Sequence, residues 1–281
     1  MAYQWYPGHM TKTMRSMQED LKLIDLVIEL AEARIPRSSR NPELKNIANG
    51  KAHLLILNKA DLADPSLNDK WAAAYKAEGV HTVFIDSRAN KNVKSLKPVI
   101  MEACKEKIER NRRKGIMNRP IRAMVVGVPN AGKSTFINSF VGRSSAKTGN
   151  KPGVTKGKQW IRLSKELELL DTPGVLWPKI EEDFVGENLA MIGSIKDEIM
   201  NIEELSLILM NRLVDRHPGA LAERFGIEEM EDRYEMLKAI AVARQCLKSG
   251  AEPDTEKAAR LLIHDFRSGA LGRMTLETPD D

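Results

Sequence analysis

Hydrophobic and polar positions change their spacing along this chain of 281 residues, and the change predicts two kinds of structure. In the first two-thirds, short apolar and β-branched runs alternate with helix-like stretches, which is typical of parallel strands joined by helices. The predicted strands span residues 25–31, 52–58, 80–86 and 121–128. Helices are predicted at about 66–78 and 91–113, and a hairpin at 159–163 and 166–170. We therefore expect an α/β domain with a mostly parallel sheet and helices on both faces.

The last third of the chain has only helical spacing. Apolar residues from Leu205 to Leu213 recur every three or four positions, and His217-Pro218-Gly219 ends that helix. Further helices are predicted at 220–226, 231–248 and 255–268. The division predicted from this change is an α/β domain over 1–178 and a small all-α domain over 179–281.

The composition excludes several classes of protein. Hydrophobic residues make up 42% and charged residues 30%, so the chain is neither disordered nor a membrane protein, and no apolar run is long enough to span a bilayer. Its two cysteines, Cys104 and Cys246, exclude a disulfide framework and a zinc module built on paired cysteines. We expect a cytoplasmic protein that does not bind membranes.

Charge is distributed unevenly between the two predicted domains. Residues 1–178 hold 31 Lys and Arg against 17 Asp and Glu, whereas residues 179–281 hold 13 against 22. Two basic clusters stand out, one over 142–165 with seven basic and no acidic residues, the other over 105–114. The second is equally explained as a solvated helix face, whereas the first favours contact with RNA phosphates.

A phosphate-binding motif follows the fourth predicted strand. GVPNAGKS (127–134) matches G-x-x-x-x-G-K-[ST] between a strand and a helix, where backbone N–H groups and the helix N-terminus bind phosphates. Lys133 is expected to reach the β- and γ-phosphates, and Ser134 to ligate Mg²⁺. The predicted nucleotide-binding residues of this loop are Asn130, Ala131, Gly132, Lys133, Ser134 and Thr135.

A second motif, DTPG (171–174), lies about 40 residues further on, after another predicted strand. Asp171 can hold Mg²⁺ through water, and the N–H of Gly174 can contact a γ-phosphate. In the polar stretch between the two motifs, Thr155 is the candidate for a second hydroxyl on Mg²⁺ and the γ-phosphate. Together these residues predict a site for a nucleoside triphosphate and Mg²⁺.

The sequence NKAD (58–61), at the end of the second predicted strand, indicates which base is bound. The carboxylate of Asp61 can accept hydrogen bonds from N1–H and the 2-amino group of guanine, whereas adenine offers neither donor there. Asn58 and Lys59 are expected to brace the loop and cover the base. A weaker candidate for a backbone contact to guanine O6 follows the third strand: Ser87, Arg88 and Ala89.

The order of the motifs is unusual, because N-K-x-D precedes the phosphate loop by some 70 residues. The chain thus resembles the circularly permuted GTPases, and within them the ribosome biogenesis GTPase A family. The resemblance covers essentially the whole chain. It rests on the helical tail and on five segments: WYPGHM (5–10), AEARIP (31–36), GVPNAGKS (127–134), PGVT (152–155) and DTPGVLWP (171–178). Glu32 departs from the Asp usual at that position in the family.

This resemblance implies a GTPase with bound GTP or GDP and Mg²⁺ that acts late in maturation of the large (50S) ribosomal subunit and is released upon hydrolysis. It implies as partners the large-subunit precursor, its ribosomal RNA, contacted by the helical domain, and ribosomal proteins. We expect a monomer. Two other functions remain open: a GTP-gated RNA-binding scaffold with incidental hydrolysis, and a permuted GTPase of small-subunit assembly. The second is disfavoured, because the chain lacks a cysteine-rich zinc module.

Hydrolysis needs a group that orients water, and Val175 and Leu176 stand where Ras-like enzymes have a Gln. The resemblance implies His9 for this role, although a single histidine is also explained as a helix cap or a packed residue. It also implies that Asn130 accompanies a K⁺ ion beside the phosphates. The candidate catalytic residues are therefore His9, Asn130, Lys133 and Thr155. Since DTPG runs directly into the helical domain, we expect the nucleotide state to set that domain's orientation.

Overall fold

The computed structural model describes residues 16–44, 50–93, 95–117, 119–142, 159–172, 174, 176–177 and 180–281. Six strands in these ranges form one sheet in the order β3-β2-β1-β4-β6-β5. The strands are β1 (Leu26–Glu32), β2 (Ala52–Asn58), β3 (Thr82–Phe84), β4 (Ile121–Val126), β5 (Gln159–Arg162) and β6 (Leu167–Asp171). All neighbours are parallel except β5 and β6, which form the predicted hairpin. The mostly parallel α/β sheet is thus confirmed.

Helices cover both faces of the sheet, as expected. Along β2, Leu54 and Ile56 belong to one hydrophobic cluster and Leu55 and Leu57 to another, because successive strand residues point to opposite faces. Helix α3 (Pro65–Ala77) packs Trp71 and Tyr75 on the second cluster, and α6 (Lys133–Val141) packs Phe136 and Ile137 on the first. Since both faces of the central strands are covered, their sequences are nearly all apolar.

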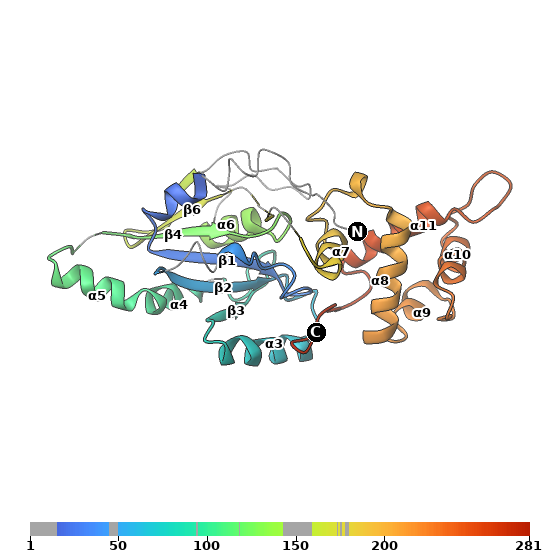
Figure 1. Cartoon of the computed structure of the whole chain (residues 1–281), viewed down its shortest axis with the longest axis horizontal. Coiled ribbons are helices and arrows are strands. Elements are labelled where there is room, and N and C mark those ends of the chain that lie inside the picture. The colour runs from blue at the N-terminus through green and yellow to red at the C-terminus, as the bar shows by residue number, and fades with distance from the viewer. Residues whose placement is uncertain are drawn as a thin grey trace.

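The helix predicted over 91–113 is instead two helices. Helix α4 (Leu96–Ala103) buries Leu96 and Ile100, and it ends at the buried Cys104. Helix α5 (Lys105–Arg113) fully buries none of its residues and extends beyond α4 at the left of Figure 1. The apolar face needed to keep one straight helix on the sheet is reduced beyond Cys104 to Ile108, the one apolar residue of α5, which packs half-buried against the core.

Beyond residue 180, the regular structure is helical apart from an isolated bridge between Leu247 and Pro253. The elements are α7 (Asp183–Met191), the 3-10 turn η1 (Asp197–Ile199), α8 (Ile202–Arg216), α9 (Ala220–Phe225), α10 (Arg233–Ala243) and α11 (Thr255–Ser268). In the part of the chain described, none of the helices has the length and apolar character needed to cross a membrane.

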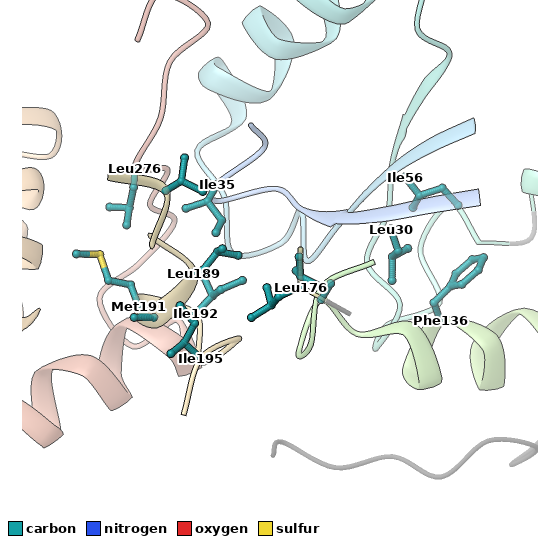
Figure 2. Packing of buried hydrophobic residues seen from close by; sticks show 14 of the residues in the cluster. Leu30, Ile35, Ile56, Phe136, Leu176, Leu189, Met191, Ile192, Ile195 and Leu276 are labelled. Carbon is teal, nitrogen blue, oxygen red and sulfur yellow. The ribbon is translucent and has the colours of Figure 1, made fainter. Parts of the chain in front are cut away.

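These C-terminal helices and the sheet share one hydrophobic cluster. In Figure 2, Leu176 lies between Leu30 and Phe136 on the sheet side and Leu189 and Ile192 on the helical side. The last residues, 270–281, then return to the sheet, so that the C-terminus lies beside α3 (Figure 1). The division at residue 178 stays a prediction, and the packing shows that the α/β and helical parts are in contact.

Candidate functional site

The predicted motifs meet at one edge of the sheet. Asn58 ends β2, Asp171 ends β6, and the phosphate loop follows β4 directly. Because β1, β2, β4 and β6 are mutually parallel, their carboxyl ends lie along the same edge. This is where open α/β sheets bind their ligands. Segments separated by some 110 residues in the chain thus form a single candidate site.

Two features of the phosphate loop require its sequence. Gly132 has φ +93°, and a Cβ there would lie 2.4 Å from Nδ2 of Asn58. Asn130 also has a positive φ, 61°, which asparagine tolerates better than most residues. Gly132 is the N-cap of α6, so the N–H groups of the following residues, including Ser134 and Thr135, belong to the first turn of that helix. Such a turn presents backbone donors to an anion.

Lys133 is buried at the centre of this edge. Its ammonium donates to the carbonyl oxygens of Gly127, at 3.0 Å, and Val128, at 2.9 Å. Burial lowers the pKa of Lys133 to about 8, against the opposing influence of the Asp171 carboxylate. A Cβ on Gly174 would lie 2.8 Å from the lysine Nζ, so the DTPG segment lies directly on the phosphate loop.

Asp171 has the properties expected of a cation ligand. Burial raises its pKa to about 6, although the Lys133 ammonium lowers it. Its Oδ1 atom is buried and accepts no hydrogen bond. A buried oxygen without a partner is costly unless an ion or a water fills the place. The carboxylate of Asp171 and the hydroxyl of Ser134, at the start of α6, are oxygen donors of the kind that Mg²⁺ binds, and their role as its ligands stays a prediction.

Asn58 ties the base-recognition loop to the phosphate loop. Its buried Nδ2 donates to the carbonyl of Ala131 at 2.9 Å. Its Oδ1 accepts from the hydroxyl of Ser87 at 2.8 Å and from the Ser87 backbone N–H at 3.2 Å. The bracing role predicted for Asn58 therefore has a definite geometry: one amide joins three separate loops.

Lys59 is held in place by an ion-pair network that the motif alone did not indicate. It has φ 58°, and its Nζ lies 2.6 Å from Oε2 of the fully buried Glu32. Glu32 also binds the Arg34 guanidinium. Burial tends to raise the pKa of Glu32, but the charges of Arg34 and Lys59 outweigh it and lower the pKa. The departure at Glu32 thus keeps a carboxylate between two cations.

The side chain of Asp61 is accessible to solvent, and so to a base, although part of it is buried. Partial burial and the neighbouring Asp86 both raise its pKa. Asp86 in turn accepts from the backbone N–H groups of Arg88, at 2.8 Å, and Ala89, at 3.0 Å. A contact from Ala89 to guanine O6 would have to share or replace that hydrogen bond, and it stays a prediction.

The side chain of Asn130 is directed toward the helical part of the chain. Its Nδ2 donates to the carbonyl of Gly193, two residues beyond α7. The next residue, Ser194, donates its hydroxyl to the carbonyl of Pro129. The phosphate loop is therefore bonded to the segment after α7, a contact that no spacing or motif in the sequence suggested.

The C-terminal segment makes a second unpredicted contact. The N–H of Met274 donates to Leu62 O at 2.9 Å, and the N–H of Asp64 donates to the Thr275 hydroxyl at 2.9 Å. These bonds fix the residues that directly follow N-K-x-D. We call this C-terminal segment, residues 270–281, the strap. Its residues follow no recognisable hydrophobic pattern, so the sequence gives no signal of these contacts.

Several predicted site residues lie outside the described part of the chain: His9, Thr155 and Val175. Most of the basic cluster 142–165 does as well, and only Arg162 and Lys165 of its charged residues are described, both exposed. Leu176 is described and is buried, in accord with the expectation that it cannot orient water.

Known proteins resemble this chain over its whole length. A protein-family model described as a 50S ribosome-binding GTPase matches residues 122–243. Ribosome biogenesis GTPase A of Bacillus cereus is 45% identical, over 100% of this chain and 95% of its own length. The chain belongs to the ribosome biogenesis GTPase A family. The chain is therefore a GTPase.

Solved structures resembling this family member share its architecture. The crystal structure of GNP-bound YlqF from T. maritima matches with a TM-score of 0.66 and 27% identity, over 96% of this chain and 99% of that one. A GDP-bound structure of YlqF matches with a TM-score of 0.69 and 26% identity, over 95% and 100%. Both share the overall fold of this chain along nearly its whole length.

Proposed function

We propose that this family member binds GTP at the edge described above, hydrolyses it, and acts on a precursor of the large ribosomal subunit. The observation that carries the proposal is the bridge made by Asn58, which joins the base loop to the phosphate loop. A ligand that uses both loops must carry a purine-like base at one end and phosphates at the other. The carboxylate of Asp61 then selects guanine, because adenine would leave it without donors.

The residues at the phosphate end divide the work of binding. Lys133 exchanges the carbonyls of Gly127 and Val128 for the β- and γ-phosphates, and the first turn of α6 donates backbone N–H groups. Ser134, Asp171 and Thr155 would hold Mg²⁺, which when bound neutralises charge on the phosphates. Gly174, packed against Lys133, would place its N–H at the γ-phosphate.

Water must be oriented by a residue other than those after DTPG, since Leu176 is buried and apolar. We assign this role to His9, as the family resemblance implies, and place K⁺ beside Asn130. Without a resident Gln or Arg the isolated enzyme should turn over slowly, at about 10⁻⁴–10⁻² s⁻¹. The ribosomal particle would raise this rate by ordering the groups that act on water.

We propose ribosomal RNA as the main contact on the particle. Exposed basic residues that could contact phosphates include Arg110, Arg112 and Lys114 around α5, and Arg162 and Lys165 near β5. Each phosphate contact makes the logarithm of RNA affinity fall more steeply with the logarithm of salt. Replacing Arg110 and Arg112 by Gln should therefore reduce the salt slope for RNA binding by about 1 to 2. An unchanged slope would exclude α5 from the interface.

Release of the protein from the ribosomal particle after GTP hydrolysis distinguishes this function from that of a scaffold. The variant His9→Ala should bind GTP as the wild type does and remain on the particle, because the chemical step is blocked. Normal release of His9→Ala would instead favour a GTP-gated RNA-binding scaffold. A factor of this kind works where ribosomes are assembled, so we place it in the cytoplasm. We further propose that it acts as a monomer.

A further inference from the structure

The C-terminal end of α11 is linked to both halves of the proposed nucleotide site. Phe266 and Arg267 are neighbours in the chain, yet Phe266 is linked through Arg34 to the base-recognition loop, and Arg267 is linked through the segment after α7 to the phosphate loop. Neither belongs to a nucleotide-binding motif. Arg267 is one of the basic residues at the end of a helix whose charges could have been directed at RNA, but its guanidinium instead turns toward the protein.

The first connection passes through Arg34. This buried arginine donates to the carbonyl of Phe266 and stacks on its ring, with the guanidinium carbon 4.5 Å from the ring centroid. The same guanidinium binds Glu32, whose other oxygen holds Nζ of Lys59 at 2.6 Å. Phe266 is thereby linked through two buried charges to the second residue of N-K-x-D.

The second connection passes through Arg267. Its Nε donates to the carbonyl of Met191 at 2.9 Å, and one terminal nitrogen donates to that of Ala190 at 2.8 Å. These carbonyls are at the C-terminal end of α7, where that of Ala190 also accepts from the backbone N–H of Gly193 at 2.9 Å. The guanidinium is also held by Asp197, at 2.7 and 2.9 Å.

The segment that Arg267 fixes is the one bonded to the phosphate loop. Gly193 accepts from Asn130, and Ser194 donates to Pro129. The packing is close, because a Cβ on Gly193 would lie 3.2 Å from Nδ2 of Asn130 and 3.3 Å from the guanidinium carbon of Arg267. Movement of α11 therefore cannot leave the phosphate loop unaffected.

A glycine just past α11 brings the helix against the base-recognition loop as well. Gly269, with φ +84°, has its backbone so near Leu62 that a Cβ would lie 2.6 Å from the leucine Cδ2. Leu62 directly follows Asp61 in the chain. The end of α11 thus touches the base side of the site by packing and by the Arg34 network.

We propose that Arg34 and Arg267 are positioning residues through which the end of α11 sets the geometry of the base loop and of the phosphate loop, respectively. Guanine nucleotide binding and the placement of the C-terminal helices are then coupled. The coupling is reciprocal: a particle that shifts these helices changes nucleotide affinity, and nucleotide changes the helices' affinity for the particle by the same factor. The inference rests on the nucleotide site proposed above.

The connections through Arg267 and through Arg34 predict different effects on nucleotide binding. A general loss of stability would not produce such a difference. In Arg267→Gln, the affinities for GDP and for inosine diphosphate should fall together by at least about fivefold, the lower end of typical coupling. In Arg34→Lys, the preference for GDP over inosine diphosphate should shrink, because inosine lacks the 2-amino group that Asp61 reads. Both can be measured with fluorescent nucleotide analogues and competition by the unlabelled diphosphates.

The control is Arg224→Gln. Arg224 also forms an ion pair with α11, through Asp265 at 2.8 Å, and its side chain is 35% exposed against 26% for Arg267. It touches neither loop, so its nucleotide affinities should match the wild type. The double variant Asn130→Ala with Arg267→Gln should lose no more affinity than the stronger single variant, since both act on one connection.

The outcomes separate this inference from the proposed function. A wild-type protein that binds no GDP would refute the nucleotide site itself. Wild-type affinity and base preference in folded Arg267→Gln and Arg34→Lys would overturn the positioning role alone, as would equal losses in Arg224→Gln. If Arg34→Lys does not fold, as judged by its circular dichroism, Arg267→Gln and the double variant decide the matter.

Discussion

The bridge made by Asn58 allows a quantitative prediction for the variant Asn58→Ala. The side chain makes three hydrogen bonds, one to Ala131 and two to Ser87, and it is 2% exposed. At about 1 kcal/mol net for each bond, the substitution removes about 3 kcal/mol of interaction. Because Ser87 and Ala131 are buried too, part of this loss should lower the stability of the nucleotide-free protein. The remainder should appear in binding, since bound nucleotide requires both loops in place, as a rise of roughly tenfold or more in the Kd for GDP.

The assay is titration of a fluorescent GDP analogue, with urea unfolding of the nucleotide-free protein beside it. Asn68→Ala is a matched control: this residue is half-buried on α3, and its Oδ1 makes no hydrogen bond. Ser87→Ala loses only one of the side-chain bonds, so its effect should be about fivefold. A Kd for Asn58→Ala within threefold of the wild type would refute the bridging role.

Three further predictions concern the phosphate end of the site. The pKa of Lys133 is about 8, and phosphates require its ammonium form, so the Kd for GDP should rise about tenfold between pH 7 and pH 9. In Lys133→Met this pH dependence should be absent. A wild-type Kd as independent of pH as that of Lys133→Met would contradict the prediction. Gly132→Ala should abolish measurable GDP binding, because its Cβ would lie 2.4 Å from Asn58 Nδ2. Gly142→Ala is the control, since Gly142 has a similar φ but open space around it, and this variant should still bind GDP. Equal binding by both variants would argue against the loop geometry. Turnover should be faster in K⁺ than in Na⁺ and lose that difference in Asn130→Ala, and equal wild-type rates would exclude a K⁺ ion there.

The sequence predicted the sheet and the motifs well because both are local. The run AHLLILN marks β2 with its observed bounds, and Asn58 ends it, so the strand and the base motif are read from the same seven residues. Thr255–Ser268 likewise has the bounds that its apolar spacing predicts. Each of these segments either follows a hydrophobic period of 2 or 3.6 residues or forms a continuous apolar run. Such a pattern can be recognised without knowing which other segments pack against it.

The sequence could not predict contacts made between distant segments. Arg34 and Phe266 are 232 positions apart, and Glu277 accepts from Ser38 across 239. The residues near Glu277 follow neither period, so nothing marks them as a strap over the base-recognition loop. Arg267 shows the same limit, since a charged residue late in a helix is compatible with solvent, RNA or the end of another helix.

Control of the enzyme by the ribosomal particle can be tested in a single experiment. GTP hydrolysis should be followed with the protein alone and with purified mature 50S, immature large-subunit and 30S particles at equal concentration. Turnover should be slow with the protein alone, clearly faster with large-subunit particles and unchanged by 30S particles. Equal rates with and without every particle would contradict it.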